Sequence, residues 1–288
     1  MKTSDFYFHL PERLIAQEPT SERDESRLLV LHRDGTTEDR LFCHLPEYMS
    51  EGDMLLLNKT KVFPARLIGC KPTGGRLEIL LVKNLSGDLW EILCHKKFTG
   101  RLTISDTLEA DVHEGKTAEL HYKGDISDVL LRDGMMPLPP YIKRRPEEKD
   151  KGRYQTIYAE DEGSIAAPTA GLHFTERLIK EIEARGVLVR RLTLHVGKGT
   201  FIPVRAEDPR DHAMGAEYFE ISSGLIEEIK QIKRLRRRLF AVGTTATRAI
   251  EGFLSGRYQP IGNGDGVIRG TTDVFIYPGF NFKAVDCL

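Results

Sequence analysis

The chain has 288 residues, of which 40% are hydrophobic and 30% are charged, and its formal net charge at pH 7 is −1. A chain of this length and composition is expected to form about two globular domains with a real core, which excludes a wholly disordered protein. The near-zero net charge neither predicts nor excludes a nucleic-acid partner, because only a local basic patch can decide that question.

The cysteines and the N-terminus indicate a cytoplasmic protein. The four cysteines are scattered and form no Cys-x-x-Cys pair, which argues against a zinc knuckle and a disulfide framework. Residues 1–17 lack the apolar core of a signal peptide, and no run of 18 apolar residues occurs. We therefore expect no membrane span.

The first 65 residues mix short elements. Apolar runs bounded by turn residues at 26–35 and 52–60 predict two buried strands. The segment LPERLIAQ (10–17) predicts a short amphipathic helical turn.

From Arg66 to about Gly134, short apolar runs separated by Gly, Asn and Asp follow one another, and no helical stripe interrupts them. The runs lie at 66–70, 76–82, 89–95, 101–105, 109–115 and 118–124. This spacing is typical of a small antiparallel barrel or sandwich. The proline-rich segment 134–145 predicts a stiff, extended connection out of it.

An α/β alternation begins after Arg145. Helices are predicted from Thr175 to about Arg185, from Ser222 or Ser223 onward, and after Thr245. Strands are predicted at 187–196, 239–245 and 271–279, and the charged segment 147–153 is expected to be a solvated linker.

The predicted fold class is therefore α/β with several domains. An α/β domain with a mixed sheet, formed by residues 1–65 and 136–288, is interrupted by an antiparallel β-barrel domain at residues 66–135.

Two motifs lie where a strand ends and polar side chains gather. In AVGTTATRAIE (241–251), a strand, a turn with Thr244 and Thr245, and a helix start would collect free N–H groups and hydroxyls, which favours an anion. An ordinary turn with a threonine N-cap explains the same residues and is favoured when the motif is taken alone. In NKTKVFPARL (58–67), polar side chains follow an apolar strand, and ligands in open α/β sheets sit at strand ends. A polar turn leading into the barrel explains the same residues and is favoured on spacing alone.

Two further motifs place a histidine beside glycines. PTAGLHFTERL (168–178) contains His173 near a helix start, and HVGKGTF (195–201) contains His195 beside Gly197 and Gly199. An imidazole at such a place is a plausible base or hydrogen-bond donor. A β-turn and a satisfied structural histidine are the competing interpretations.

Other patterns are weaker. The basic run KQIKRLRRRLF (230–240) is read as a solvated helix face, with a phosphate-binding edge as the alternative. No His-x-x-x-His or His-Glu-x-x-His spacing occurs, so no metal site is expected, and no Ser-His-Asp or Cys-His nucleophile pattern emerges.

Taken in order, the motifs resemble the S-adenosylmethionine:tRNA ribosyltransferase-isomerase family of the queuosine pathway. The resemblance runs from about Asp5 to Asp286. It rests on the following stretches: DFYFHLPERLIAQEP, RDESRLLVL, GDMLLLNKTKVFPARLIGCKPTGGRLEILL, MPLPPYI, YQTIYAEDEGSIAAPTAGLHFT, TLHVGKGTFIPVR, FAVGTTATRAIE and FIYPGFNFKAVD.

The resemblance implies a transferase-isomerase activity. Such an enzyme moves the ribosyl part of S-adenosylmethionine onto a 7-aminomethyl-7-deazaguanine base at the tRNA wobble position. The product is epoxyqueuosine, and adenine and methionine are released. S-adenosylmethionine is then a substrate and no resident cofactor is expected. The implied partners are this substrate and the tRNA, and the protein is expected to be a monomer.

The resemblance and the chemistry together suggest site residues. His173 and His195 are the candidates for proton transfer, as adjacent walls of one pocket. Asn58, Thr60, Arg66, Thr169, Gly171, Gly197, Gly199, Thr200, Thr244 and Thr245 are the candidates for substrate binding.

This chain departs from the family pattern twice. Gly215 stands where the family commonly has a histidine, so no role is carried over to it. Family members continue beyond the VDCL end with a Thr-Asn-Phe-His turn and a helix, so the resemblance predicts a truncated C-terminus that impairs activity.

Two rival functions remain open on the sequence. A methyltransferase would carry a glycine-rich turn with an acidic ribose-binding residue after the next strand, and that pair is not found. A non-catalytic RNA-binding module would use the barrel, which lacks an evident row of aromatic residues.

Overall fold

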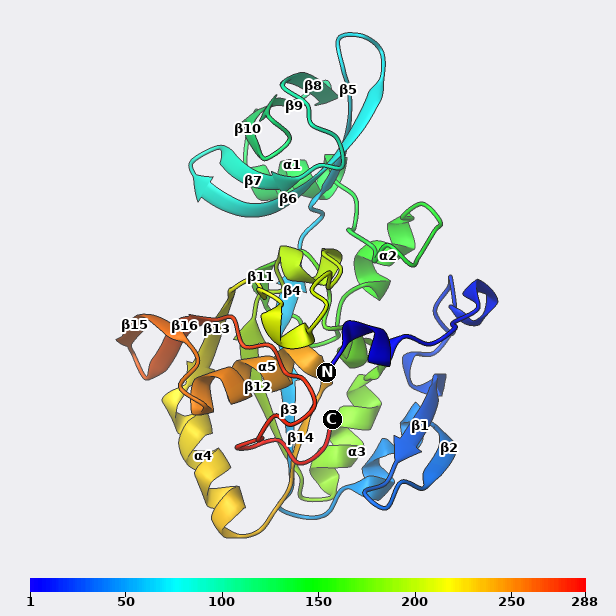
Figure 1. The fold of residues 1–288 in the computed structure, drawn as a ribbon, viewed down its shortest axis with the longest axis vertical. Coiled ribbons are helices and arrows are strands. Elements are labelled where there is room, and N and C mark those ends of the chain that lie inside the picture. The colour runs from blue at the N-terminus through cyan, green and yellow to red at the C-terminus, as the bar shows by residue number, and fades with distance from the viewer.

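The computed structural model describes residues 1–288, with the side chain of Asn263 excepted. Figure 1 shows a barrel at one end of the molecule and a mixed sheet with its helices at the other. The predicted fold class is confirmed, and all six barrel strands fall within residues 66–135. The domain boundaries themselves stay a prediction.

The larger sheet has six strands in the order β14-β3-β12-β13-β16-β15. The first three are parallel to one another, and the later pairs are antiparallel, so the sheet is mixed as predicted. Its strands are β14 (Leu239–Ala241), β3 (Met54–Asn58), β12 (Leu188–Leu194), β13 (Glu217–Ser222), β16 (Val267–Thr272) and β15 (Gln259–Gly264).

Strand β3 explains why this sheet has helices on both faces. All five of its residues are buried, as expected for a central strand of a covered sheet. Met54 and Leu56 pack with α4 (Ser223–Arg234) and α5 (Gly243–Leu254), whereas Leu55 and Leu57 pack with α3 (Glu176–Ala184). The alternation of side chains along one strand therefore serves two cores.

Two of the three helix N-caps considered in the sequence analysis are observed in the structure. Thr175 Oγ1 accepts the Leu178 N–H at the start of α3, and Ser222 Oγ accepts the Leu225 N–H at the start of α4. The threonine N-cap considered for α5 is wrong, because the helix begins earlier, at Gly243, and its N-cap is Val242 without a side-chain bond. Thr244 and Thr245 consequently lie in the first turn.

The barrel closes in the order β10-β7-β6-β5-β8-β9. Its inward side chains, including Leu67, Ile79 and Leu102, are fully buried. The strands are β5 (Arg66–Cys70), β6 (Arg76–Ser86), β7 (Leu89–Leu93), β8 (Gly100–Ser105), β9 (Leu108–His113) and β10 (Thr117–Tyr122).

A helix that the sequence analysis missed covers the barrel. Helix α1 (Ile126–Asp133) is capped by Asp125 and buries Val129 and Leu130 in the barrel core. At two turns it is too short to show a clear apolar stripe.

Three other expectations are corrected. The strand predicted at 26–35 forms as β1 (Arg27–Leu31) but is not buried, since it pairs only with β2 (Thr37–Leu41) and leaves Leu29 66% and Leu31 70% exposed. The charged segment at 147–153 is helix α2 (Glu148–Arg153), because Asp150 is buried and accepts two hydrogen bonds from Arg144. The strand predicted at 271–279 ends at Thr272, after which the chain leaves the sheet.

The remaining elements are short. β4 (Thr60–Val62) and β11 (Asp161–Ser164) form a two-stranded parallel sheet between the barrel and the larger sheet. The single 3-10 turns are η1 (Thr3–Phe6), η2 (Glu12–Leu14), η3 (Arg23–Glu25), η4 (Phe42–Tyr48), η5 (Thr169–His173), η6 (Lys198–Phe201) and η7 (Pro209–Asp211). Across the described part of the chain, no helix is both long enough and apolar enough to cross a bilayer.

A buried glutamate on α5 holds the last segment of the chain. The Glu251 side chain is fully buried and accepts three backbone N–H bonds, from Lys283 at 2.7 Å, Ala284 at 2.9 Å and Val285 at 2.8 Å. Further along, Cys287 pairs with Phe240 on the sheet edge. One carboxylate therefore fixes the segment that runs past the start of α5.

We predict that Glu251→Gln lowers the free energy of unfolding by about 1–3 kcal/mol, because an amide N–H₂ would face a backbone N–H that needs an acceptor. Chemical denaturation measures this change. Glu228→Gln, on the half-exposed pair with Arg190, is the control and should change stability by less than about 1 kcal/mol. Equal effects of the two changes would contradict the role given to Glu251.

Candidate functional site

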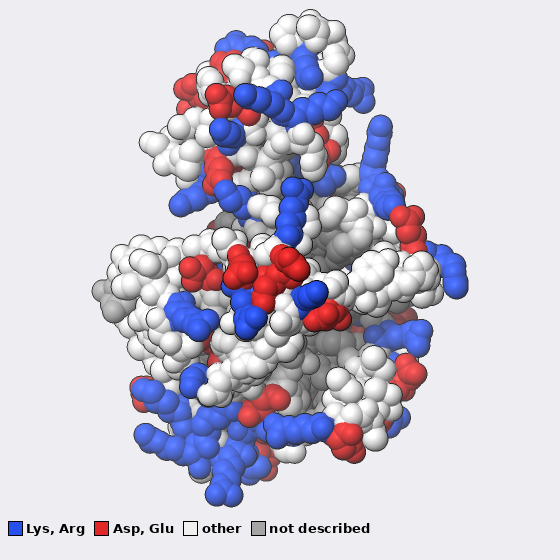
Figure 2. Space-filling model, viewed as in Figure 1, with Lys and Arg blue, Asp and Glu red and all other residues white. Residues whose placement is uncertain are grey.

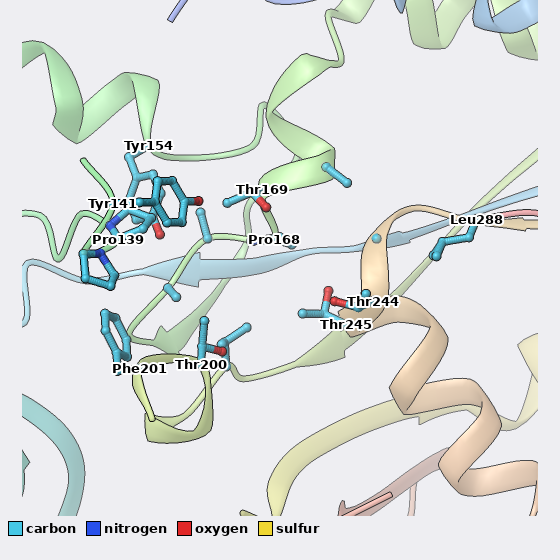
Figure 3. A pocket seen from close by; sticks show the side chains of 16 residues that line it. Pro139, Tyr141, Tyr154, Pro168, Thr169, Thr200, Phe201, Thr244, Thr245 and Leu288 are labelled. Carbon is cyan, nitrogen blue, oxygen red and sulfur yellow. The ribbon is translucent and has the colours of Figure 1, made fainter. Parts of the chain in front are cut away.

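A cavity of about 450 Å³ opens beside the N-terminus of α5. Figure 3 shows its two ends: Tyr141, Tyr154, Pro139 and Phe201 lie at one end, and Thr244 and Thr245 at the start of α5 lie at the other. Thr169, Pro168 and Thr200 line the space between. The volume is within the range of about 300–1,000 Å³ usual for small-molecule sites.

Two polar atoms at this first cavity are buried without a hydrogen-bond partner among the described residues, namely the Tyr154 hydroxyl and Thr245 Oγ1. Tyr154 is only 6% exposed, and burial raises the pKa of its phenol. The Ala167 backbone N–H faces the hydroxyl outside normal hydrogen-bond geometry and partly opposes this shift. A buried polar atom left unpaired costs stability, so such atoms are rare unless a ligand or water completes them. These two atoms make the cavity a candidate binding site.

The helix start adds positive potential at the same place. The first N–H groups of α5 have no partner within the helix, and the helix dipole places partial positive charge there. Thr244 and Thr245 add two hydroxyls in the same turn. This end of the first cavity therefore suits an anionic group, and its aromatic end suits a flat apolar one.

A second cavity of about 730 Å³ lies between the barrel and the mixed sheet. Trp90 and Glu91 line it from the barrel, Leu130 from α1, and His195, Gly197 and Tyr218 from the sheet side. The two cavities share Val196 in their walls. The turn η6 separates them: Lys198 lines the second cavity and forms an ion pair with Glu91, while Thr200 and Phe201 line the first.

His195 is held in a fixed position at the second cavity. Its Nδ1 lies 2.8 Å from Thr60 Oγ1, and its ring stacks on Tyr218 with centroids 5.6 Å apart. On the other side, a Cβ on Gly163 would come within 2.8 Å of Nε2, so only glycine leaves room for the ring. Burial lowers the pKa of His195 below its ordinary 6.5, against the opposing charges of Asp161 and Glu220. The imidazole is therefore neutral at pH 7 and able to accept a proton.

Asn58 and Thr60 support this histidine and do not line either cavity. Asn58 is fully buried, with Nδ2 donating to the Leu194 carbonyl at 3.0 Å and Oδ1 accepting the N–H groups of Leu194 and Thr60. The Asn58 side chain is thus fully engaged with the backbone, and the Thr60 hydroxyl is engaged with His195. The expectation that these residues meet the substrate gains no support from the geometry.

A buried ion pair fixes the loop after His195. Glu217 accepts the Gly197 N–H at 2.9 Å and a bond from Arg248, which also donates to the carbonyls of Gly215, Thr272 and Val274. Burial raises the pKa of Glu217 and lowers the pKa of Arg248, and the pairing of the two opposes both shifts. Neither residue was predicted from the sequence. Arg248 lies within the motif at 241–251, so the motif could have drawn attention to it.

His173 lies apart from His195. Its ring packs on Phe42 with centroids 5.2 Å apart, and it lines neither of the two cavities described above. Burial lowers its pKa, with the Arg23 backbone opposing. Neighbouring Gly171 is crowded by Tyr158, whose hydroxyl lies 2.2 Å from where a Cβ would stand. The structure therefore does not make the two histidines adjacent walls of one cavity.

The remaining candidates divide between the two cavities and their supports. Thr169, Thr200, Thr244 and Thr245 meet in the first cavity, and Gly197 meets His195 in the second. Gly199 faces Met214, and Arg66 donates to the Leu138 carbonyl where the barrel begins. Tyr154 was missed because it follows a segment read as a solvated linker. Within the described residues, no cluster of three or more His, Cys, Asp or Glu side chains has the arrangement of a metal site.

Comparisons with known proteins show which family the chain belongs to. A family model described as queuosine biosynthesis protein matches residues 3–288. Two curated proteins named S-adenosylmethionine:tRNA ribosyltransferase-isomerase, from Thermodesulfovibrio yellowstonii and Halothermothrix orenii, are each 47% identical to the chain, covering 100% of it and 86% of their own length.

A solved structure is also similar, a crystal structure of S-adenosylmethionine tRNA ribosyltransferase from Thermotoga maritima. It is 29% identical, covers 98% of this chain and 82% of its own, and has a TM-score of 0.49. From the family match and the two curated relatives, the chain belongs to the queuosine biosynthesis protein family and is an enzyme of its ribosyltransferase-isomerase type.

Proposed function

We propose that the chain transfers the ribosyl part of S-adenosylmethionine to a 7-aminomethyl-7-deazaguanine base at the tRNA wobble position. The sugar rearranges to an epoxycyclopentane, giving epoxyqueuosine, and adenine and methionine leave. The observation that carries this proposal is the first cavity, with its unpaired Tyr154 hydroxyl and Thr245 Oγ1 beside a helix start. Relatives at 47% identity whose names include S-adenosylmethionine and tRNA support it.

In this proposal S-adenosylmethionine occupies the first cavity. The methionine carboxylate lies at the N-terminus of α5, where N–H groups and Thr244 and Thr245 are free to donate. The adenine lies between Tyr141, Tyr154 and Phe201, and the Tyr154 hydroxyl donates to the departing purine. Stabilising the leaving adenine in this way assists cleavage of its bond to the sugar.

The base of the tRNA enters from the second cavity. Because the cavities share Val196, the sugar and the aminomethyl group meet beside His195. The sulfonium acidifies the sugar carbon next to it, so a neutral imidazole is a base of sufficient strength to remove its proton. His195 lines a cavity and His173 does not, which favours His195 for this step. The absence of a resident cofactor and of a metal, and the monomeric state, remain predictions.

The decisive test is product analysis. The protein is incubated with S-adenosylmethionine and a tRNA carrying the aminomethyl precursor base, and the small products are separated. Free adenine and methionine in equal amounts are expected. S-adenosylhomocysteine would indicate methyl transfer and would contradict the proposal, as would binding of tRNA with no consumption of S-adenosylmethionine.

Tyr154→Phe tests the first cavity. The hydroxyl has no well-formed hydrogen bond to any described residue, so its removal should change stability by less than about 1 kcal/mol. The same change should weaken S-adenosylmethionine binding by about tenfold, measured by calorimetry. Tyr158→Phe is the matched control, because its hydroxyl is also buried and unpaired but lines neither cavity, and it should leave binding unchanged. A similar loss in both variants would remove the assignment.

His195→Gln tests the base. Turnover should fall by about 10²- to 10⁴-fold while thermal unfolding shows a folded protein. Because burial lowers the pKa of His195, kcat/KM of the unchanged enzyme should rise with pH through an acidic limb centred below the ordinary 6.5 and level off above it. That limb should be lost in the variant.

His173→Ala is the comparison for the same experiment. The sequence-based hypothesis predicts a sharp fall in turnover for this variant too. Loss of turnover in His173→Ala together with near-normal turnover in His195→Gln would assign the proton transfer to His173 and refute the present assignment.

A further inference from the structure

A cluster of cations surrounds the C-terminal end of α4 and the strand β1. Lys233, Arg236, Arg237 and Arg238 lie there together with Arg33. Figure 2 shows Lys and Arg side chains gathered over the lower end of the molecule, where Figure 1 places α4. Neither the first nor the second cavity uses these residues.

Only some of these cations are neutralised. Lys233 forms an ion pair with Asp286, and Arg238 forms one with the buried Asp53. Arg33, Arg236 and Arg237 make no ion pair with any side chain that the structure describes, and the neighbouring Arg234 makes none either. These four guanidinium groups are available to an anionic partner.

Helix capping explains part of the cluster. Lys233 and Arg234 lie in the last turn of α4, where cations interact favourably with the helix dipole. The dipole does not explain Arg236, which has a φ of +55°. Glycine or asparagine is the usual residue at such a left-handed position after a helix, so the arginine stands there at a conformational cost.

The cations border a groove of about 1,020 Å³. Its lining also includes apolar side chains, among them Phe42, Leu45 and Phe240. The groove and the first cavity share Ala170, Gly243 and Leu288 in their walls. An extended polyanion lying on the cations would therefore run toward the reaction site.

We propose that this basic groove binds the phosphodiester backbone of the tRNA substrate. Guanidinium groups pair with phosphate oxygens through two parallel N–H donors, and apolar side chains accept riboses or unstacked bases. The inference rests on the proposed function for the identity of the RNA, and the groove is a contact separate from the pocket that holds the reacting base. An anionic membrane would use the same cations, and the test distinguishes it from the tRNA.

The test uses the double variant Arg236→Gln/Arg237→Gln, with Arg236→Lys/Arg237→Lys as the charge-conserving control. Lys180→Gln, an exposed cation on α3, is a second control. Binding of an unmodified tRNA transcript is measured at several salt concentrations by fluorescence anisotropy. The Gln variant should bind about tenfold more weakly and lose between about one and two units of the slope of log K against log salt. Both controls should keep the slope.

Further measurements separate this inference from the proposed function. S-adenosylmethionine affinity, and adenine release at saturating precursor tRNA, should be unchanged in the Gln variant. If the unchanged protein binds tRNA through these arginines but releases no adenine, the proposed function fails and the inference stands. An unchanged salt slope in the Gln variant, an equal loss in the Lys variant, or no tRNA binding by the unchanged protein would overturn it. The inference would also be overturned if the Gln variant lost binding to phosphatidylserine vesicles but bound tRNA as the unchanged protein does.

Discussion

The site depends on one side chain, the amide of Asn58. Strands β3 and β12 lie parallel and their backbone register ends with Leu192 opposite Asn58. Beyond that point the Asn58 side chain forms the hydrogen bonds between the two segments. It donates to the carbonyl of Leu194 and accepts the N–H groups of Leu194 and Thr60. A fully buried amide satisfied in this way keeps two diverging chains at a set separation. His195 follows one of these chains and Thr60 the other, so their 2.8 Å contact is a consequence of the amide.

In the loops outside the sheet, buried carboxylates accept the backbone N–H groups that a neighbouring strand would accept inside it. Glu217 and Glu251 each accept backbone N–H groups from segments that have left regular structure, near Gly197 and near Ala284. Burying a charge is unfavourable unless it is compensated, so each carboxylate holds its loop only while all its donors are in place. The loops around the cavities are thus anchored at a few polar points and not by broad apolar packing.

Much of the fold was accessible from the sequence because its signals are local. The apolar run 54–57 of β3, the Ser222 and Thr175 caps and the regular spacing of the barrel strands each identify an element without reference to its neighbours. The exposure of β1 and the brevity of α1 depend on what packs nearby, so the sequence could not settle them. The candidate site residues stay a prediction: several of them line the two cavities, but their arrangement could not be read from the sequence. Motif membership identifies polar residues, yet it cannot tell whether Thr60 faces a ligand or another side chain.

The short turn η6 has a mechanical consequence. Residues of this turn, Lys198–Phe201, line both cavities, and Lys198 also forms an ion pair with Glu91 on the barrel. A displacement of this turn would alter the walls of both cavities and the Lys198–Glu91 contact with the barrel. If binding in one cavity displaces the turn, the affinity at the other changes, and the effect is the same in both directions.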